Sequence, residues 1–207
     1  MQNIPFVGIA GIIGVGKSTL TEKLAKKLGV PAFWEPVKEN PYLEEFYKNI
    51  GRWAFSMQVH LLNERFVQHQ EIVWLGKGAI QDRTIYEDTI FAEMLYEAGF
   101  ITEIEYKTYL NLFLNMTKFL QRPDVIIFLD VKPEIALERI KMRNRGAESG
   151  ITLDYLIDLK NGYEKFYDRL GGVLNIQRVD WNEFGKEDDL IQSLELSELK
   201  NRWGSHF

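Results

Sequence analysis

The sequence predicts an α/β protein with a five-stranded parallel sheet and helices on both of its faces. Short apolar runs alternate along the chain with longer segments of helical periodicity, which is typical of parallel sheets. The clearest run, residues 125–129, has five apolar residues in succession before Asp130, as expected for a strand buried on both faces. Since ligands bind at the carboxyl ends of strands in such folds, residues that follow the strands are the first functional candidates.

The expected elements follow one another without a repeat, a low-complexity segment or a linker. In the first half we expect strands at residues 4–10, 30–34 and 78–81, and helices at 18–28, 52–75 and 86–98. In the second half we expect helices at 103–120, 133–143, 152–170 and after Lys186, and strands at 125–129 and 173–179. Gly29 is a natural stop for the first helix, and Pro133 suits a first helical position, where its missing N–H costs nothing. We therefore expect a single domain over residues 1–207.

Composition excludes several classes of function. The 207 residues suit one domain, and 25 basic against 30 acidic side chains give a net charge of −5. A binder of nucleic-acid polymers would normally be basic. The absence of cysteine excludes disulfides, thiolate metal sites and a cysteine nucleophile, and it fits a reducing compartment. The apolar residues 4–15 are too short for a membrane span and lack a basic leader, so we expect a soluble, cytoplasmic protein without a membrane partner.

A phosphate-binding motif lies between the first strand and the first helix. Residues 11–18 read Gly-Ile-Ile-Gly-Val-Gly-Lys-Ser and match G-x-x-x-x-G-K-[ST]. The glycines allow a tight loop whose backbone N–H groups point at phosphate oxygens, and the helix dipole favours the anion. We expect Lys17 to reach the β- and γ-phosphates and Ser18 to hold Mg²⁺, so the fold is of the P-loop NTPase type with ATP and Mg²⁺ as cofactors. The predicted phosphate-binding residues are Gly11, Gly14, Gly16, Lys17, Ser18 and Thr19.

The P-loop identifies the phosphate donor but not the reaction. A GTPase switch would also need a base-reading Asn-Lys-x-Asp after a strand, and the sequence has none. Its one Asp-x-x-Gly, residues 168–171, ends an expected helix instead of following a strand. The leading class is therefore a small-molecule kinase.

Further motifs surround the P-loop and carry a resemblance to a family. They are Glu35-Pro36-Val37, Asp82-Arg83-Thr84, the arginines Arg139, Arg143 and Arg145, and Asn40-Pro41-Tyr42-Leu43. Together they resemble the deoxynucleoside kinases, and the last motif resembles the bacterial deoxyadenosine/deoxyguanosine branch. The resemblance covers residues 4–200 and implies ATP-dependent phosphorylation of the 5′-hydroxyl of a deoxynucleoside in nucleotide salvage. It also implies a homodimer.

The resemblance assigns the reacting groups. Glu35 would be the general base that accepts the proton of the 5′-hydroxyl, a poor nucleophile. Arg83 would orient Glu35 and stabilise charge on the transferred phosphoryl group. Asp82 would complete the Mg²⁺ shell through water, beside Ser18. The alternatives are a solvated glutamate before a proline and a surface ion pair at a strand end.

A base-binding site is predicted on the long helix at residues 52–75. Gln58 and Arg65 are seven residues apart, nearly two turns, so they point the same way. By resemblance, Gln58 makes paired hydrogen bonds to the base, and Arg65 with Asp88 matches the pair of cytidine- and purine-accepting kinases. Phe91 would stack on the base and Met57 would line the site. This implies deoxyadenosine or deoxyguanosine, with deoxycytidine left open; for Arg65 the alternative is a solvated helix face.

Sugar and donor contacts complete the resemblance. Tyr47 and Glu148 match the residues that bind the 3′-hydroxyl. Arg139 and Arg143, four residues apart on one helical face, would form with Arg145 an arginine-rich lid at about residues 143–150 that closes over the ATP phosphates. The alternative is a basic helix end that offsets the helix dipole. The remaining predicted donor contacts are the adenine-reading residues Glu183 and Phe184.

Two other functions stay open. Thymidylate kinases share the P-loop, the Asp-Arg pair and the pattern at residues 125–134. They usually carry an acidic residue where this chain has Ile13, and glycines where it has Val37 and Lys38. A regulatory nucleotide-binding protein without catalysis would not need Glu35 and Arg83.

Overall fold

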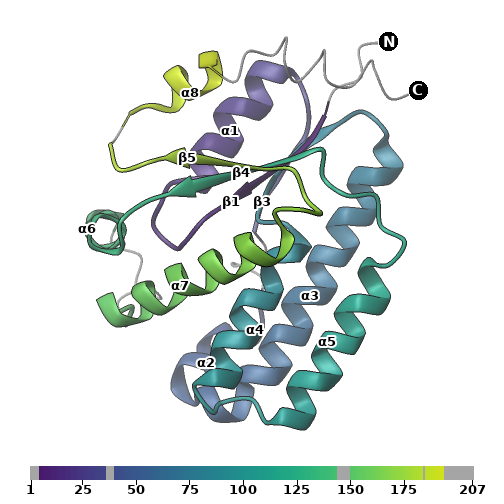
Figure 1. Cartoon of the computed structure of the whole chain (residues 1–207), viewed down its shortest axis with the longest axis vertical. Coiled ribbons are helices and arrows are strands. Elements are labelled where there is room, and N and C mark those ends of the chain that lie inside the picture. Colours follow the sequence, from purple (N-terminus) through teal and green to yellow (C-terminus); the bar gives the residue numbers. More distant parts are fainter. Residues whose placement is uncertain (1–4, 36–39, 144–149, 184, 194–207) are drawn as a thin grey trace.

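The computed structural model describes residues 5–35, 40–143, 150–183 and 185–193. Five parallel strands form one sheet in the order β2-β3-β1-β4-β5 (Figure 1). The strands are β1 (Phe6–Ala10), β2 (Ala32–Phe33), β3 (Ala79–Asp82), β4 (Val125–Asp130) and β5 (Ile176–Asp180). The predicted fold class is therefore confirmed.

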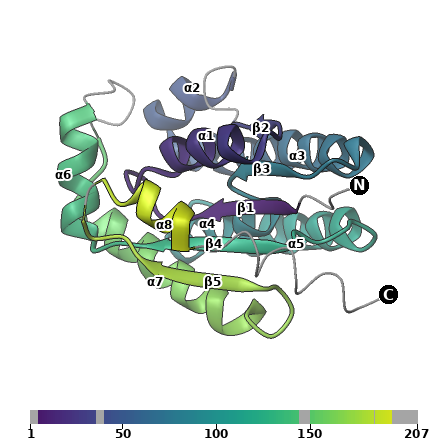
Figure 2. The ribbon, with the colours of Figure 1, turned by 90° about the horizontal axis from the view of Figure 1, so that it is seen from above.

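Helices cover both faces of this sheet. They are α1 (Lys17–Leu28), α2 (Leu43–Lys48), α3 (Ile50–Leu75), α4 (Asp88–Glu97), α5 (Glu103–Thr117), α6 (Pro133–Arg143), α7 (Leu153–Leu170) and α8 (Glu187–Ser193), with a 3₁₀ turn, η1, at Ile85–Glu87. Figures 1 and 2 show α1 and α8 on one face and α3, α4, α5 and α7 on the other. In the part of the chain that the structure describes, no helix combines the length and the apolar character needed to cross a bilayer.

Burial explains why the central strands are apolar throughout. Every residue of β1 and the first five residues of β4 are buried, because helices pack on both sides of them. At the edge of the sheet β2 has only two residues and pairs with β3 alone. The strand predicted at residues 30–34 is thus present but shorter, and α2 is a helix that the sequence analysis did not predict.

The registers of the strands bring their carboxyl ends to one edge of the sheet. Ile9 of β1 lies opposite Asp82 of β3, and Ala10 lies opposite Phe128 of β4. The phosphate-binding loop follows β1 directly at this edge, and Arg83 follows β3. The fold therefore gathers the predicted donor and acceptor residues from distant parts of the sequence.

Candidate active site

The phosphate-binding loop has a backbone that requires its glycines. Gly11, Gly14 and Gly16 have φ angles of 143°, 86° and 97°, which side chains rarely allow. A Cβ atom on Gly14 would lie 2.6 Å from the carbonyl oxygen of Ala136 on α6. Gly16 caps α1 in the left-handed conformation, so the loop leads directly into the helix N-terminus. The structure therefore has the loop-to-helix arrangement that binds phosphate.

Lys17 is buried at the start of α1 and folds back over this loop. Its Nζ donates to the carbonyl oxygens of Gly11 at 3.1 Å and of Ile12 at 3.0 Å. Burial lowers the pKa of Lys17 to about 8, and Arg83 acts in the same direction while nearby carboxylates oppose it. The ammonium group is thus held inside the loop, where a phosphate oxygen would replace carbonyl partners and favour its charged form.

Ser18 and Asp82 form a pair that fits a magnesium ion. Ser18 Oγ donates to Asp82 Oδ2 at 2.6 Å, and Ser18 is exposed next to the loop. The other oxygen, Asp82 Oδ1, is buried and has no hydrogen-bond partner among the described residues. No cluster of three acidic, histidine or cysteine side chains suited to a metal occurs in the described ranges. Mg²⁺ needs only one or two ligands from the protein, because water molecules and phosphate oxygens of the substrate fill its other coordination positions.

Glu35 sits between two buried arginines. Its Oε1 lies 3.0 Å from Arg65 Nη2 and 3.1 Å from Arg83 Nε, and the guanidinium groups are 1% and 2% exposed. Partial burial of Glu35 raises its pKa, but Arg83 and Arg65 outweigh this and hold the pKa at about 2. The carboxylate is therefore ionised and fixed in place beside the P-loop lysine.

Three of the predicted base-binding residues each have a buried polar atom without a hydrogen-bond partner. Arg65 Nε donates to Asp88 Oδ1 at 2.5 Å, so α3 and α4 are joined by the predicted pair. Gln58 Oε1, Arg65 Nη1 and Asp88 Oδ2 are buried and have no hydrogen-bond partner among the described residues. Buried polar groups are usually satisfied, and a bound base could supply the partners of these three atoms. Other buried side chains, such as Thr21 and His69, also carry an unpartnered atom, so what matters here is that three of them lie on predicted base-binding residues.

Neighbouring elements hold the rest of the acceptor residues. Asn40 Nδ2 contacts Met57 Sδ at 3.1 Å, while Asn40 Oδ1 accepts from the Tyr42 backbone N–H at the start of α2. The α2 helix then carries Tyr47, which is 47% exposed. On α4 the ring of Phe91 lies beneath the Arg83 guanidinium, whose Cζ is 4.8 Å from the ring centroid. Phe91 is thus part of the same group of residues.

The predicted lid residues divide into two groups. Arg139 is buried, and its guanidinium donates to the carbonyl oxygens of Val15 at 3.3 Å and of Trp181 at 2.9 Å. Arg139 thus connects the P-loop to the segment after β5, whereas Arg143 is exposed at the end of α6. Glu183, in the predicted adenine-reading loop, pairs with Lys186 at 2.8 Å. Three predicted site residues lie outside the described residues: Arg145, Glu148 and Phe184.

The structure adds three residues that the sequence analysis did not single out. Tyr155 on α7 is 36% exposed, and partial loss of hydration, with Tyr47 and Glu35 nearby, raises its pKa above the usual value while Arg83 opposes the shift. Tyr163 on α7 and Glu87 in η1 contact each other and Arg83. Read alone, a tyrosine on a helix suggests only ordinary packing, so no sequence pattern marks these positions.

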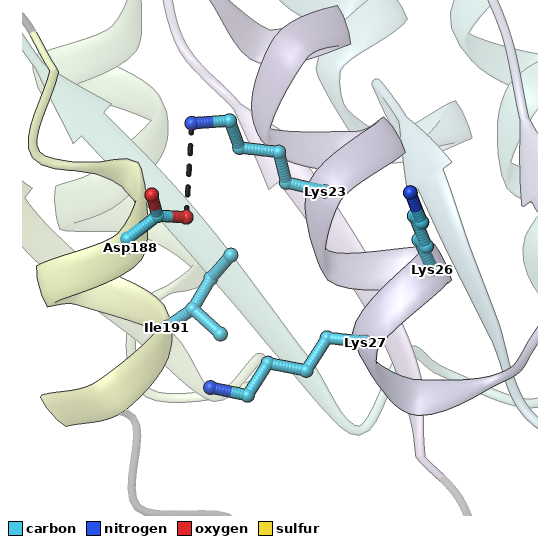
Figure 3. A pocket seen from close by; sticks show the side chains of 5 residues that line it. All are labelled: Lys23, Lys26, Lys27, Asp188 and Ile191. Atoms are coloured by element: carbon cyan, nitrogen blue, oxygen red, sulfur yellow. Dashed lines mark ion pairs between the residues drawn. The ribbon is translucent and has the colours of Figure 1, made fainter.

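A hollow between α1 and α8 is separate from this site (Figure 3). Its lining residues are Lys23, Lys26, Lys27, Asp188 and Ile191. Lys23 Nζ lies 3.7 Å from Asp188 Oδ1, an ion pair that links α8 to α1. These lysines belong to the later turns of α1, away from the P-loop end, so the hollow takes no part in phosphate binding.

Comparisons with known proteins agree with this geometry. A sequence profile described as deoxynucleoside kinase matches residues 7–198. A deoxyadenosine kinase of Dictyostelium discoideum is 45% identical over 91% of this chain and 77% of its own length. A deoxyadenosine/deoxycytidine kinase of Bacillus subtilis is 40% identical over 89% of this chain and 87% of its own.

A solved structure is similar over nearly the whole chain. Deoxyadenosine kinase from M. mycoides with bound dCTP superposes with a TM-score of 0.82 at 34% identity, covering 92% of this chain and 98% of that one. The profile match and these identities are well beyond what a shared fold alone would give. This chain belongs to the deoxynucleoside kinase family and is a deoxynucleoside kinase.

Proposed function

We propose that this kinase transfers the γ-phosphoryl group of ATP to the 5′-hydroxyl of a purine deoxynucleoside, with deoxycytidine as a further acceptor. The observation that carries the proposal is the set of unpartnered buried atoms on Gln58, Arg65 and Asp88. An amide oxygen, a guanidinium nitrogen and a carboxylate oxygen offer the donors and acceptors that the edge of such a base needs. Relatives named deoxyadenosine, deoxyguanosine and deoxyadenosine/deoxycytidine kinases support the same acceptors.

Glu35 is the group that takes the proton of the attacking hydroxyl. A carboxylate with a pKa of about 2 is a weak base, so it serves first to hold the hydroxyl in line with the γ-phosphorus. In a loose transition state the hydroxyl loses its proton late, when its acidity has risen. Arg83, 3.1 Å from Glu35, then stabilises the charge on the phosphoryl oxygens.

The donor side contributes binding and charge neutralisation. The backbone N–H groups of residues 11–18 and the ammonium group of Lys17 hold the phosphates. Ser18 and Asp82 would hold Mg²⁺, which supplies charge stabilisation to the transferring group when bound. Arg143 and Arg145 at the proposed lid would close over the phosphates, and Glu183 with Phe184 would read the adenine.

Sugar contacts and assembly follow from the family resemblance. Tyr47 and Glu148 are the proposed partners of the 3′-hydroxyl. We propose a homodimer in the cytoplasm that acts in nucleotide salvage. The proposed partners are a small-molecule deoxynucleoside, a nucleoside triphosphate and a second copy of this chain, with no membrane and no nucleic-acid polymer.

A panel of acceptors tests the proposal. With ATP and Mg²⁺, deoxyadenosine, deoxyguanosine, deoxycytidine, thymidine and thymidylate are compared in a coupled assay of ADP release. We expect the purine deoxynucleosides to have the highest kcat/KM, deoxycytidine to be accepted, and thymidylate to give no turnover. A preference for thymidylate would favour the thymidylate kinase alternative, and nucleotide binding without any ADP release would favour a regulatory protein.

A further inference from the structure

A chain of two hydrogen bonds leads away from Arg83 into the protein. Arg83 Nη1 donates to the hydroxyl oxygen of Tyr163 at 2.6 Å, and that hydroxyl donates to Glu87 Oε2 at 2.6 Å. The other oxygen, Glu87 Oε1, accepts from the Thr84 backbone N–H at 2.8 Å. The nitrogen that faces Glu35 is a different one, Nε. The guanidinium is thus held through one nitrogen while another faces the acceptor residues.

The three side chains joined by these hydrogen bonds are all buried. Arg83 is 2%, Tyr163 1% and Glu87 0% exposed, so water does not compete for these bonds. Burial of a polar hydroxyl and a carboxylate is costly unless each is satisfied, and here each has a partner within the chain. The arrangement therefore keeps the guanidinium of Arg83 in one orientation.

The backbone of Arg83 has an unusual conformation that also constrains where its side chain lies. Its φ is 66°, and among the described residues it is the one non-glycine with a positive φ. Such a conformation costs energy and persists where the surroundings over-determine it. Its side chain is fixed by Glu35, by Tyr163 and by the ring of Phe91, 4.8 Å from Cζ. Backbone and side chain are thus constrained together at the carboxyl end of β3.

The hydroxyl of Tyr163 acts as a spacer between two opposite charges. Glu87 Oε2 lies 3.8 Å from Arg83 Nη1, beyond hydrogen-bond reach, while the hydroxyl bridges the two at 2.6 Å on either side. The tyrosine comes from α7 and its ring stacks on Phe128 of β4, with centroids 5.3 Å apart. Its position is therefore set by packing that does not depend on Arg83.

We propose that Tyr163 and Glu87 are positioning residues that orient the Arg83 guanidinium toward the reacting hydroxyl and the transferred phosphoryl group. This inference rests on the role proposed above for Arg83. It gives α7 a part in the reaction, and that part depends on the hydroxyl of Tyr163 alone. A purely structural contact between α7 and η1 would instead affect stability and leave the chemistry unchanged.

The variant Tyr163→Phe tests the inference, because it removes the hydroxyl and keeps the ring that stacks on Phe128. We expect kcat to fall about 10- to 100-fold, as small misplacements of reacting groups do, with both KM values within about twofold of wild type. The matched control is Tyr86→Phe, which removes the hydroxyl of another buried tyrosine, whose ring packs against His69 and Phe113. The control should keep wild-type kcat, and thermal melting of both variants would reveal a loss of fold.

A double-mutant cycle with Arg83→Lys shows whether Tyr163 acts through Arg83. Non-additive effects identify residues that work as one unit, so Tyr163→Phe should cost little further kcat in the Arg83→Lys background. An equal loss in both backgrounds would overturn the positioning role, as would wild-type kcat for Tyr163→Phe alone. Wild-type kcat for Arg83→Lys would instead show that the proposed function of Arg83 is wrong.

The substitution Glu87→Gln provides an independent variant if Tyr163→Phe folds poorly. Its amide oxygen can still accept from the Thr84 N–H, so the turn at η1 keeps its cap, while the charge that holds the Tyr163 hydroxyl is lost. We expect kcat to fall by a smaller factor than in Tyr163→Phe, about 3- to 10-fold, again with unchanged KM values. An unchanged kcat would remove Glu87 from the proposal.

Discussion

The donor and acceptor sides of the active site are built in opposite ways. The donor side is a contiguous loop, residues 11–18, whose backbone we expect to do most of the binding and whose glycines have the φ angles that the loop requires. The acceptor side consists of charged side chains that are paired inside the protein. They come from the segments after β2 and β3 and from the helices α3 and α4, and they include Glu35, Arg65, Arg83 and Asp88.

This difference has consequences for mutation. A backbone site tolerates changes that leave its φ angles and close approaches intact, and it fails where a Cβ atom intrudes. A network of buried charges fails when one partner is removed, since the remaining charge is left unpaired. The donor side should therefore depend on shape, whereas the acceptor side should depend on charge balance.

The largest effect is expected from Glu35→Gln on the acceptor side. The amide keeps the size of the side chain and one acceptor oxygen, but it can no longer take the proton. General base catalysis contributes about 10²- to 10⁴-fold, so kcat should fall by that order with a modest change in KM. Steady-state kinetics against the preferred deoxynucleoside measure it. A variant with more than half of wild-type kcat would remove Glu35 from the mechanism.

The Arg65–Asp88 pair tests whether charge balance governs the acceptor side. Replacing Arg65 with a small apolar residue leaves the buried Asp88 without its partner, which typically costs about 3–5 kcal/mol of stability. Replacing Asp88 should cost less, because Arg65 keeps its ion pair with Glu35. Replacing both should cost less and should shift preference toward thymidine, because an apolar surface tolerates its methyl group. Chemical denaturation and the acceptor panel measure both effects. An unchanged substrate order in the double variant would mean that these residues do not read the base.

Gly14→Ala tests the dependence of the donor side on shape. Its Cβ would lie 2.6 Å from the Ala136 carbonyl oxygen, and its φ of 86° is unfavourable for alanine. We expect the KM for ATP to rise about 10- to 100-fold while the Kd for the deoxynucleoside stays the same. The control is Gly29→Ala, which has a φ of 67° and no atom within 4 Å. It should cost about 1 kcal/mol of stability and leave the KM for ATP unchanged.

The smallest effect concerns pH. Partial burial raises the pKa of Glu35, but Arg83 and Arg65 hold it at about 2, below the usual glutamate value of 4.5. A lowered pKa in the folded state stabilises the protein above pH 4.5, and this contribution is lost as the pH falls toward 2. The difference in unfolding free energy between wild type and Glu35→Gln should therefore shrink as the pH falls below 4.5. A difference that stays the same from pH 5 to pH 3 would contradict the lowered pKa of Glu35.

Much of the fold was predictable because local patterns determine it. The buried strands β1 and β4 read as unbroken apolar runs, and α6 was predicted with its observed bounds from Pro133 onward. The helix α2 was missed because it has only six residues: Leu43, Phe46 and Tyr47 stand at helical spacing, but so short a run does not distinguish a helix from a loop. The strand order was not predicted, since it depends on which crossovers pack best and not on any one segment.

The donor and acceptor sides of the site also differ in how far local sequence predicts them. The P-loop is contiguous, so its motif and its conformation can be recognised together. The pairing of Arg65 with both Glu35 and Asp88 joins residues 30 and 23 positions apart, and only the folded chain shows it. Tyr163 is 80 residues from Arg83 and forms its bond through a hydroxyl that also suits ordinary packing.

We infer that the donor and acceptor sides face each other across the carboxyl edge of the sheet, so that one molecule can occupy both. The triphosphate of the preferred deoxynucleoside carries a nucleoside for the acceptor side and phosphates for the P-loop. Because the nucleoside and the phosphates are joined in one molecule, binding of one part raises the effective concentration of the other at its site. We therefore expect this triphosphate to inhibit tightly. Steady-state inhibition patterns against each substrate measure it. We predict inhibition that is competitive with both ATP and the deoxynucleoside; inhibition that is non-competitive toward both would contradict the facing sites and indicate a separate regulatory site.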